Sequence, residues 1–291
     1  MDGVGRPREW EAVLAAQQAD GAFLSYVHLK KGPTEDYNGF ATALVLDCLC
    51  QAPDLPAILS ARVRALEFLQ GCADPSCMGR FGFYPPGKQP GWMVPRLACD
   101  ADDTALFNLA LLRAGWVDRA EAARVIRDIL RPFQLTFRNE RSEPWHRVGA
   151  FETWLDARIY RNPVDCTVNV NVLTLLHASG TDCPEAAAIA EMLFAASDWA
   201  GPLKARATKL SPWYPDPIEF VFAVERATKA NVPQMAALAN QLQRLGWVAR
   251  DKAKNLPICG SSDGPIFWTC PALATARAIL AGGRNLSGRS R

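Results

Sequence analysis

A set of apolar segments that recurs along the chain constrains the fold of this 291-residue protein more than any other feature. The segments are rich in small residues, begin 50 to 64 residues apart, and each follows a loop of Gly, Pro, Asp or aromatic residues. They are Phe40–Cys50, Thr104–Ala114, Val168–Ala178, Ile218–Ala227 and Ala272–Ala281. A period of this size is typical of a supersecondary unit that is repeated.

A second set of segments, with one apolar and one mixed face, precedes the first. These segments are Glu9–Gln18, Ala57–Gln70, Ala120–Leu130, Cys183–Ala196 and Gln234–Leu245. A helix that is apolar all round must be buried on both sides, whereas an amphipathic helix covers only one side. The alternation predicts an all-α fold, an (α/α) toroid of five to six helix pairs whose apolar helices form the inner ring. An open solenoid of the same pairs is the competing arrangement.

Loops before the inner segments share a pattern in which glycine precedes an aromatic residue. It is found in residues 17–23, 79–84, 149–154 and 263–268. Glycine permits a sharp turn, and the aromatic ring can hold neighbouring helix pairs together. We expect these loops to lie together at one mouth of the toroid.

Composition sets the class of protein. Hydrophobic residues make up 49% and charged residues 21%, as in a soluble globular domain. We expect one domain over residues 1–281 and a disordered basic tail over 282–291. The net charge of +2 favours no nucleic-acid partner, and no apolar run is long enough for a transmembrane segment. Nine cysteines without paired spacing predict a reducing, cytoplasmic location.

The run Asp100-Ala101-Asp102-Asp103-Thr104-Ala105 places three carboxylates within four residues at the start of an inner segment. Like charges this close raise each other's pKa, so a member of the cluster can keep its proton near neutral pH. A neutral carboxylic acid that faces an apolar cavity can protonate a weak base such as an alkene. An acidic helix start would explain one or two of these aspartates but not the third.

This run matches the Asp-x-Asp-Asp-Thr-Ala motif, and the chain thereby resembles the class II terpene cyclases, which include squalene-hopene cyclases and copalyl-type diphosphate synthases. The glycine–aromatic loops look like degenerate forms of that family's Gln-Trp repeats. The resemblance implies that Asp102 is the Brønsted acid that protonates an isoprenoid alkene, and that Asp100 and Asp103 orient it and tune its acidity. It also implies that protonation needs no cofactor, and that Mg²⁺ enters only if the substrate is a prenyl diphosphate.

The chain departs from the family in its size. Most family members enclose the cavity between two helical domains, whereas this chain has room for one toroid. Loops, the interior of the barrel or a second copy in a homodimer must therefore close the cavity. Helical spacing lets Asp100 and Asp103 share a face, with Asp102 turned away from them.

Carbocations are stabilised by aromatic faces through cation–π attraction. The residues expected to bind the substrate are Trp92, Phe107, Trp154, Asn169, Trp213, Tyr214, Phe220, Trp268 and Arg158. Arg158 is a candidate for contact with a diphosphate. Asn169 and Asn171 are costly to bury in an apolar helix unless they form hydrogen bonds, so either could hold the acid cluster or a polar group of the substrate, or cap a neighbouring helix.

Three other functions are considered for the same residues. An acid-catalysed isomerase or hydratase of a small apolar substrate would use Asp102 without a cyclisation cascade. A non-catalytic toroid that binds an isoprenoid or a partner would leave Asp102 exposed and ionised. A zinc site from Asp47, Cys48, Cys50 and His177 does not fit the spacing of known zinc prenyltransferases, so we predict no metal site.

Overall fold

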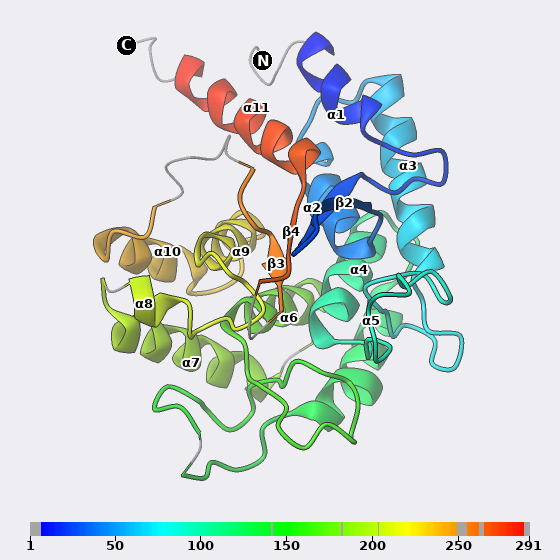
Figure 1. Cartoon of the computed structure of the whole chain (residues 1–291). Coiled ribbons are helices and arrows are strands. Elements are labelled where there is room, and N and C mark those ends of the chain that lie inside the picture. The colour runs from blue at the N-terminus through cyan, green and yellow to red at the C-terminus, as the bar shows by residue number, and fades with distance from the viewer. Residues whose placement is uncertain are drawn as a thin grey trace.

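The computed structural model of the chain describes residues 7–140, 142–181, 183–202, 204–248, 255–261 and 265–287. Its helices alternate between an inner and an outer ring (Figure 1). The inner helices are α2 (Gly39–Leu49), α4 (Ala101–Arg113), α6 (Cys166–Ser179), α9 (Ile218–Lys229) and α11 (Pro271–Ser287). The outer helices are α1 (Glu11–Ala15), α3 (Pro56–Gly71), α5 (Arg119–Val125), α7 (Pro184–Ala200) and α10 (Met235–Arg244).

The inner helices pack side by side in chain order. α2 contacts α4, α4 contacts α6 and α6 contacts α9, while α11 packs on α2. Arg277 of α11 forms an ion pair with Glu219 of α9, with distances of 2.6 and 2.8 Å, and its guanidinium lies 3.7 Å from the centre of the Phe222 ring. These contacts connect the last inner helix to α2 and, through the Arg277 side chain, to α9.

The outer helices cover this ring. α3 packs on α2 and α4, α5 on α4 and α6, α7 on α6 and α10 on α9. A π-helical turn at Ile126–Leu130 and a 3-10 turn at Arg131–Phe133 continue α5, a 3-10 turn at Pro7–Trp10 precedes α1, and the short α8 (Lys204–Ala207) follows α7. The predicted helix pairs are thus present, because the two hydrophobic patterns reflect two different degrees of burial.

A small antiparallel sheet joins the two ends of the chain and shows that the all-α prediction is incomplete. Its strands are β1 (Ser25–Leu29), β2 (Gly32–Asp36), β3 (Cys259–Gly260) and β4 (Phe267–Thr269), in the order β2-β1-β4-β3. The side chain of Asp36 accepts hydrogen bonds from Asn38, Tyr84 and Trp268 at 2.7 to 2.9 Å. This buried carboxylate links the N-terminal hairpin to β4, so the sheet also helps to close the ring.

The glycine–aromatic loops form a repeated contact with the inner helices. The backbone N–H of Phe23 donates to Thr42 Oγ1 (3.1 Å), that of Phe81 to Thr104 Oγ1 (3.1 Å) and that of Phe151 to Asn169 Oδ1 (2.8 Å). Each acceptor lies four residues after the residue that caps its helix, and those caps are Asn38, Asp100 and Asp165. The loops therefore anchor the N-terminal ends of α2, α4 and α6 in the same way.

Glycine is required in the first of these loops. Gly21 has a φ of +95°, and a Cβ built there would lie 2.0 Å from the carbonyl oxygen of Arg64 in α3. Gly79 and Gly149 adopt the same positive φ region in the next two loops. Asp263 and Gly264 of the fourth predicted loop lie outside the described residues.

The C-terminal helix differs from the prediction. α11 extends to Ser287, whereas the chain from residue 282 onward is predicted to be a disordered tail. A helix that has already formed can add residues at small cost, even through Gly282 and Gly283. Residues 288–291 lie outside the described residues. Within the ranges described, no helix has the length and apolarity needed to cross a membrane.

Candidate functional site

The acidic motif forms the first turn of α4. Asp100 is the N-cap of this helix, and its side chain accepts a hydrogen bond from the backbone N–H of Asp103 at 2.7 Å. Asp102 and Asp103 follow in the first turn, where negative charge is favourable near the positive end of the helix dipole. All three carboxylates are nevertheless buried, with 7% of Asp100, 6% of Asp102 and 1% of Asp103 exposed. The motif is therefore not a solvated acidic cap.

Asp102 is held by side chains from two other parts of the ring. The Asn171 amide of α6 donates to Asp102 Oδ1 at 2.7 Å, and the Tyr214 hydroxyl contacts Asp102 Oδ2. Arg226 of α9 in turn donates to Asn171 Oδ1 at 3.1 Å. Because the amide oxygen is occupied by a cation, the amide NH₂ group is the one that faces Asp102. Three inner helices thus fix the orientation of one carboxyl group.

The surroundings of Asp102 act on its pKa in opposite directions. Burial raises the pKa and favours the protonated acid, whereas the donors Tyr214 and Asn171 and the charge of Arg226 lower it. Burial prevails, and the pKa is raised above its ordinary value. The same donors would stabilise the carboxylate that remains after the proton leaves. Asp102 can therefore hold a proton and still be a competent acid.

The two flanking aspartates also favour protonation. Burial and the charge of Asp102 raise the pKa of Asp100 to about 7, while burial and the charges of Asp100 and Asp102 raise the pKa of Asp103 well above its usual range. Neither side-chain oxygen of Asp103 has a hydrogen-bond partner among the described residues. A charged carboxylate in that environment would be costly, so the protonated form of Asp103 is favoured.

A fourth carboxylate, Asp165, lies near this cluster and was not among the predicted catalytic residues. It caps α6 through Oδ1, which accepts from the backbone N–H groups of Thr167 and Val168 at 2.7 and 3.2 Å. Burial, followed by the charge of Asp102, raises its pKa to about 7. The sequence signal was an aspartate directly before an inner segment, since the starts of the inner segments, those of Asp165 and the Asp100–Asp103 cluster included, are expected to converge at one mouth.

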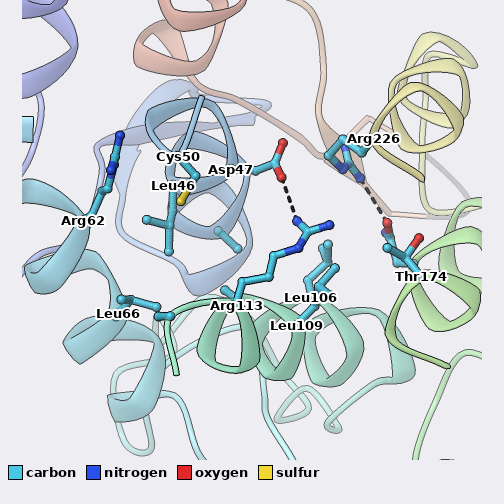
Figure 2. Close-up of a pocket in the computed structure, with 14 residues that line it drawn as sticks. Leu46, Asp47, Cys50, Arg62, Leu66, Leu106, Leu109, Arg113, Thr174 and Arg226 are labelled. Carbon is cyan, nitrogen blue, oxygen red and sulfur yellow. Dashed lines mark hydrogen bonds and ion pairs between the residues drawn. The ribbon is translucent and has the colours of Figure 1, made fainter. Parts of the chain in front are cut away.

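A cavity of about 340 Å³ lies inside the ring (Figure 2). Its lining residues are Ala43, Leu46, Asp47, Cys50, Arg62, Leu66, Leu106, Leu109, Ala110, Arg113, Ala114, Asn171, Thr174 and Arg226. Asn171 and Thr174 are buried at its inner end, whereas Cys50, Arg113 and Ala114 are exposed at its mouth. The mouth is therefore at the C-terminal ends of α2 and α4, opposite the predicted one.

The acid lies at the closed end of this cavity. Asp102, Leu106, Leu109 and Arg113 occupy one face of α4, because their spacing of three or four residues matches the helical turn. Asp102 does not itself line the cavity, but Asn171, which binds it, does. Leu106, one turn after Asp102 on the same face of α4, and Asn171, which binds Asp102, both line the cavity.

The aromatic residues predicted to bind substrate lie elsewhere, with one exception. Tyr214 contacts Asp102 and packs edge-on against Phe40. The other aromatic residues do not line the cavity described here. Trp92 lies near Trp268, Trp154 packs edge-on against Trp213, Phe107 against Phe81 and Phe220 against Trp247. Their contact with substrate stays a prediction.

The two asparagines of α6 have different partners. Asn169 donates to the carbonyl oxygens of Phe151 and Asp165 at 2.9 and 2.8 Å, in addition to accepting from Phe151, so it anchors a loop. Asn171, two residues later, binds the acid. Contact with the acid cluster, one of the roles considered for these amides, is thus found at Asn171, whereas Asn169 holds a loop and not the end of a neighbouring helix.

Arg158, the residue predicted to contact a diphosphate head group, lies outside the cavity lining. The Arg158 side chain is 90% exposed and is paired with Asp156 at 2.7 Å.

The zinc site considered from the sequence includes Cys48. Burial raises the pKa of the Cys48 thiol to about 12, which disfavours the thiolate that zinc requires. Within the described ranges, no group of three or more His, Cys, Asp or Glu side chains is arranged to hold a metal ion.

Comparison with known proteins gives a structural likeness but no match in sequence. No protein-family model matches the chain, and no curated protein matches it. A solved structure of a type II terpene cyclase from Scytonema, in complex with the substrate geranylgeranyl dihydroxybenzoate, has 16% sequence identity, and the alignment covers 95% of each chain with a TM-score of 0.45.

Proposed function

We propose that this protein is a class II-like terpene cyclase in which Asp102 protonates an alkene of an isoprenoid, and that the substrate is a prenyl diphosphate. The observation that carries the proposal is a buried aspartic acid, Asp102, bound by an amide that lines a cavity whose walls include four leucine side chains. Burial raises the pKa of Asp102 and so favours its protonated form, and Asn171 and Tyr214 stabilise the carboxylate that forms when the proton is transferred. The burial of Asp102 also favours a catalytic toroid over one that only binds a ligand.

In this mechanism the substrate enters with its terminal alkene first. Leu46, Leu66 and Leu109 provide the apolar wall along which the chain lies. A change of rotamer at Leu106 brings the alkene into contact with Asp102. The carboxylic proton adds to one alkene carbon, the π electrons form the new C–H bond, and the positive charge develops on the other carbon. An internal alkene then attacks this cation, and loss of a proton from the cyclised cation ends the reaction.

The second candidate function is an isomerisation or hydration that also begins with protonation by Asp102 but includes no cyclisation, and the cavity lining favours it. Of the residues that the structure describes as lining the cavity, none is aromatic. Cation–π stabilisation of a long series of carbocations is therefore not provided by these walls. An isomerisation or hydration, which passes through one carbocation, would need less stabilisation. The products distinguish the two: a cyclase product has the mass of the substrate and fewer alkenes, an isomer keeps both the mass and the number of alkenes, and a hydration product gains the mass of water.

The residues at the mouth do not fit a protein-bound Mg²⁺ ion. Asp47 is the only carboxylate among the described lining residues, whereas Mg²⁺ prefers several oxygen ligands. We therefore propose that proton transfer proceeds without a protein-bound metal. The homodimer and the cytoplasmic location stay predictions.

The test is turnover by the purified protein with geranyl, farnesyl and geranylgeranyl diphosphates and squalene, each with Mg²⁺ and with EDTA. Product formation by the wild type and its loss in Asp102→Asn would support the proposal, provided that the circular dichroism spectrum and the unfolding midpoint are unchanged. Turnover that persists in a folded Asp102→Asn protein would rule out the mechanism.

A further inference from the structure

The mouth of the cavity is rich in arginine side chains. Arg62, Arg113 and Arg226 line the cavity, and Asp47 is the only acidic residue that lines it with them. The inner helices present their C-terminal ends here, and these ends carry partial negative charge. An anionic group can be bound at this mouth only if side-chain cations outweigh that charge. Three arginines against one aspartate in the lining therefore indicate an anionic ligand.

The three arginines differ in how fully they are engaged. Arg62 donates to the carbonyl oxygens of Leu49 and Ala52 at 2.9 and 2.7 Å and to Asp54 at 2.6 Å. Arg226 lies deeper and holds Asn171. These two guanidinium groups therefore have structural roles.

Arg113 is different. Its ion pair is with Asp47, at 3.3 Å, and 41% of its side chain is exposed. This distance is longer than the 2.7 to 2.9 Å that is usual for a charge-assisted hydrogen bond, so the contact is weak. Figure 2 shows the pair lying between α2 and α4. Asp47 also accepts from the Gln51 amide at 3.3 Å, so it would keep a partner if Arg113 moved.

The distance from the acid to Arg113 suits an isoprenoid. Eleven residues separate Asp102 from Arg113 on one face of α4, which is about 16 Å at the helical rise per residue. An extended carbon chain advances about 3.5 Å per three bonds, as a polypeptide does, so a farnesyl chain spans about 13 Å. A chain of this length would place its terminal alkene near Asp102 when its head group is at Arg113.

We propose that Arg113 binds the diphosphate head group of the substrate, exchanging its contact with Asp47 for one with the phosphate oxygens. Asp47 then acts against binding, because it competes for the same guanidinium and repels the anion. This inference rests on the proposed function for the identity of the tail in the cavity. It assigns to Arg113 the role that the sequence suggested for Arg158.

The test is binding of farnesyl diphosphate, measured by calorimetry in an Asp102→Asn background in which no turnover is expected. Arg113→Ala should weaken binding about tenfold or more, because a hydrogen bond to a charged group is lost. Asp47→Asn should strengthen binding several-fold. Binding of farnesol, which has no charged head group, should be the same in all variants.

Two controls make the result specific. The ion pair between Arg147 and Glu191, at 2.7 Å, lies outside the cavity lining, so Arg147→Ala and Glu191→Gln should leave binding unchanged. Arg158→Ala should also bind normally. Weaker binding in both Arg113→Ala and Asp47→Asn would mean that the ion pair only supports the fold, and would overturn the proposal. Loss of binding in Arg158→Ala, with Arg113→Ala unaffected, would overturn it as well.

The outcome is separable from that of the proposed function. If turnover persists in Asp102→Asn while Arg113→Ala and Asp47→Asn change binding in opposite directions, the acid mechanism fails and the head-group site stands. If Asp102 is essential but the two mouth variants do not differ in sign, the mechanism stands and Arg113 is not the head-group residue.

Discussion

α4 and α6 begin in the same way and then differ at two positions. Asp100 and Asp165 cap the two helices, and four residues later Thr104 and Asn169 hold the backbone of the preceding loop. Between these two contacts, which both helices share, α6 has Thr167 and Val168 where α4 has Asp102 and Asp103.

The difference shows which carboxylates the fold needs. A cap is required at each helix start, and Asn38 provides it for α2 without a charge. Asp102 and Asp103 are not required by the helix, because α2 and α6 form without acidic side chains at these positions. Two buried carboxyl groups in excess of the structural need are costly, and the proposed proton transfer by Asp102 would account for their presence.

The largest expected effect separates Asp102 from its neighbours. Asp102→Asn should lower turnover about 10³-fold, because it removes the general acid. Asp100→Asn keeps an oxygen that can cap the helix, and Asp103→Asn keeps an uncharged side chain of the same shape. Each variant should therefore lose turnover by about tenfold or less. Steady-state rates and urea unfolding of the three variants would check this. An equal loss in Asp103→Asn would transfer the role of acid to Asp103 or to the pair.

The second comparison is between the two amides of α6. Asn169→Ala leaves the buried N–H of Phe151 without its acceptor and should lower the free energy of unfolding by about 2 to 3 kcal/mol. Asn171→Ala should instead lower turnover about 10- to 100-fold, since Asp102 loses a donor that stabilises its carboxylate.

The pH profile gives a further readout for Asn171. Loss of the donor raises the pKa of Asp102, so the protonated acid persists to higher pH and the falling limb of kcat/KM against pH should move upward. A variant that lowers activity only by loosening the fold would leave this limb in place. If Asn169→Ala moved the falling limb and Asn171→Ala did not, Asn169 and not Asn171 would be the amide that acts on Asp102.

A smaller effect tests whether the loop anchors are equivalent. Thr42→Val and Thr104→Val each remove the acceptor for a buried backbone N–H, of Phe23 and Phe81 respectively, and each should cost about 1 to 2 kcal/mol. Chemical denaturation would measure both. Thr42→Val should keep normal turnover per folded molecule, because Thr42 is not in the acid-bearing turn; a clear loss would mean that the α2 start also belongs to the site.

A graded effect concerns the pH dependence of stability. The pKa values of Asp100 and Asp165 are about 7 in the folded protein, above the usual value near 4, so the folded state binds more protons than the unfolded state between these values. Their contribution to stability is therefore present below about pH 4 and is lost as the pH rises toward 7 and beyond.

Asp165→Asn should reduce the slope of the unfolding free energy against pH by up to about 1.4 kcal/mol per pH unit in that window. Denaturation at several pH values between 4.5 and 8 would show the change. An unchanged slope in Asp165→Asn would mean that Asp165 titrates normally and is not part of the buried carboxylate cluster.

Much of the helical framework follows from local pattern. The inner segment predicted at Val168–Ala178 corresponds to α6, and the outer segment predicted at Cys183–Ala196 corresponds to α7. The strands were missed because β1 pairs with β4, more than 200 residues away, and no local signal encodes such a pairing. A short half-buried strand such as Phe267–Thr269 has too few residues to show alternation.

The sequence by itself determined the repeat, the two classes of helix and the place of the acidic motif at an inner-helix start, because periodicity and capping act over a few residues. Only the tertiary structure decided that Asn171, Tyr214 and Arg226 converge on Asp102, and that the cavity opens beside Arg113 and not among the predicted aromatic residues. These relations depend on how distant helices rotate and pack in a closed ring, and that rotation is set by contacts between all of them together.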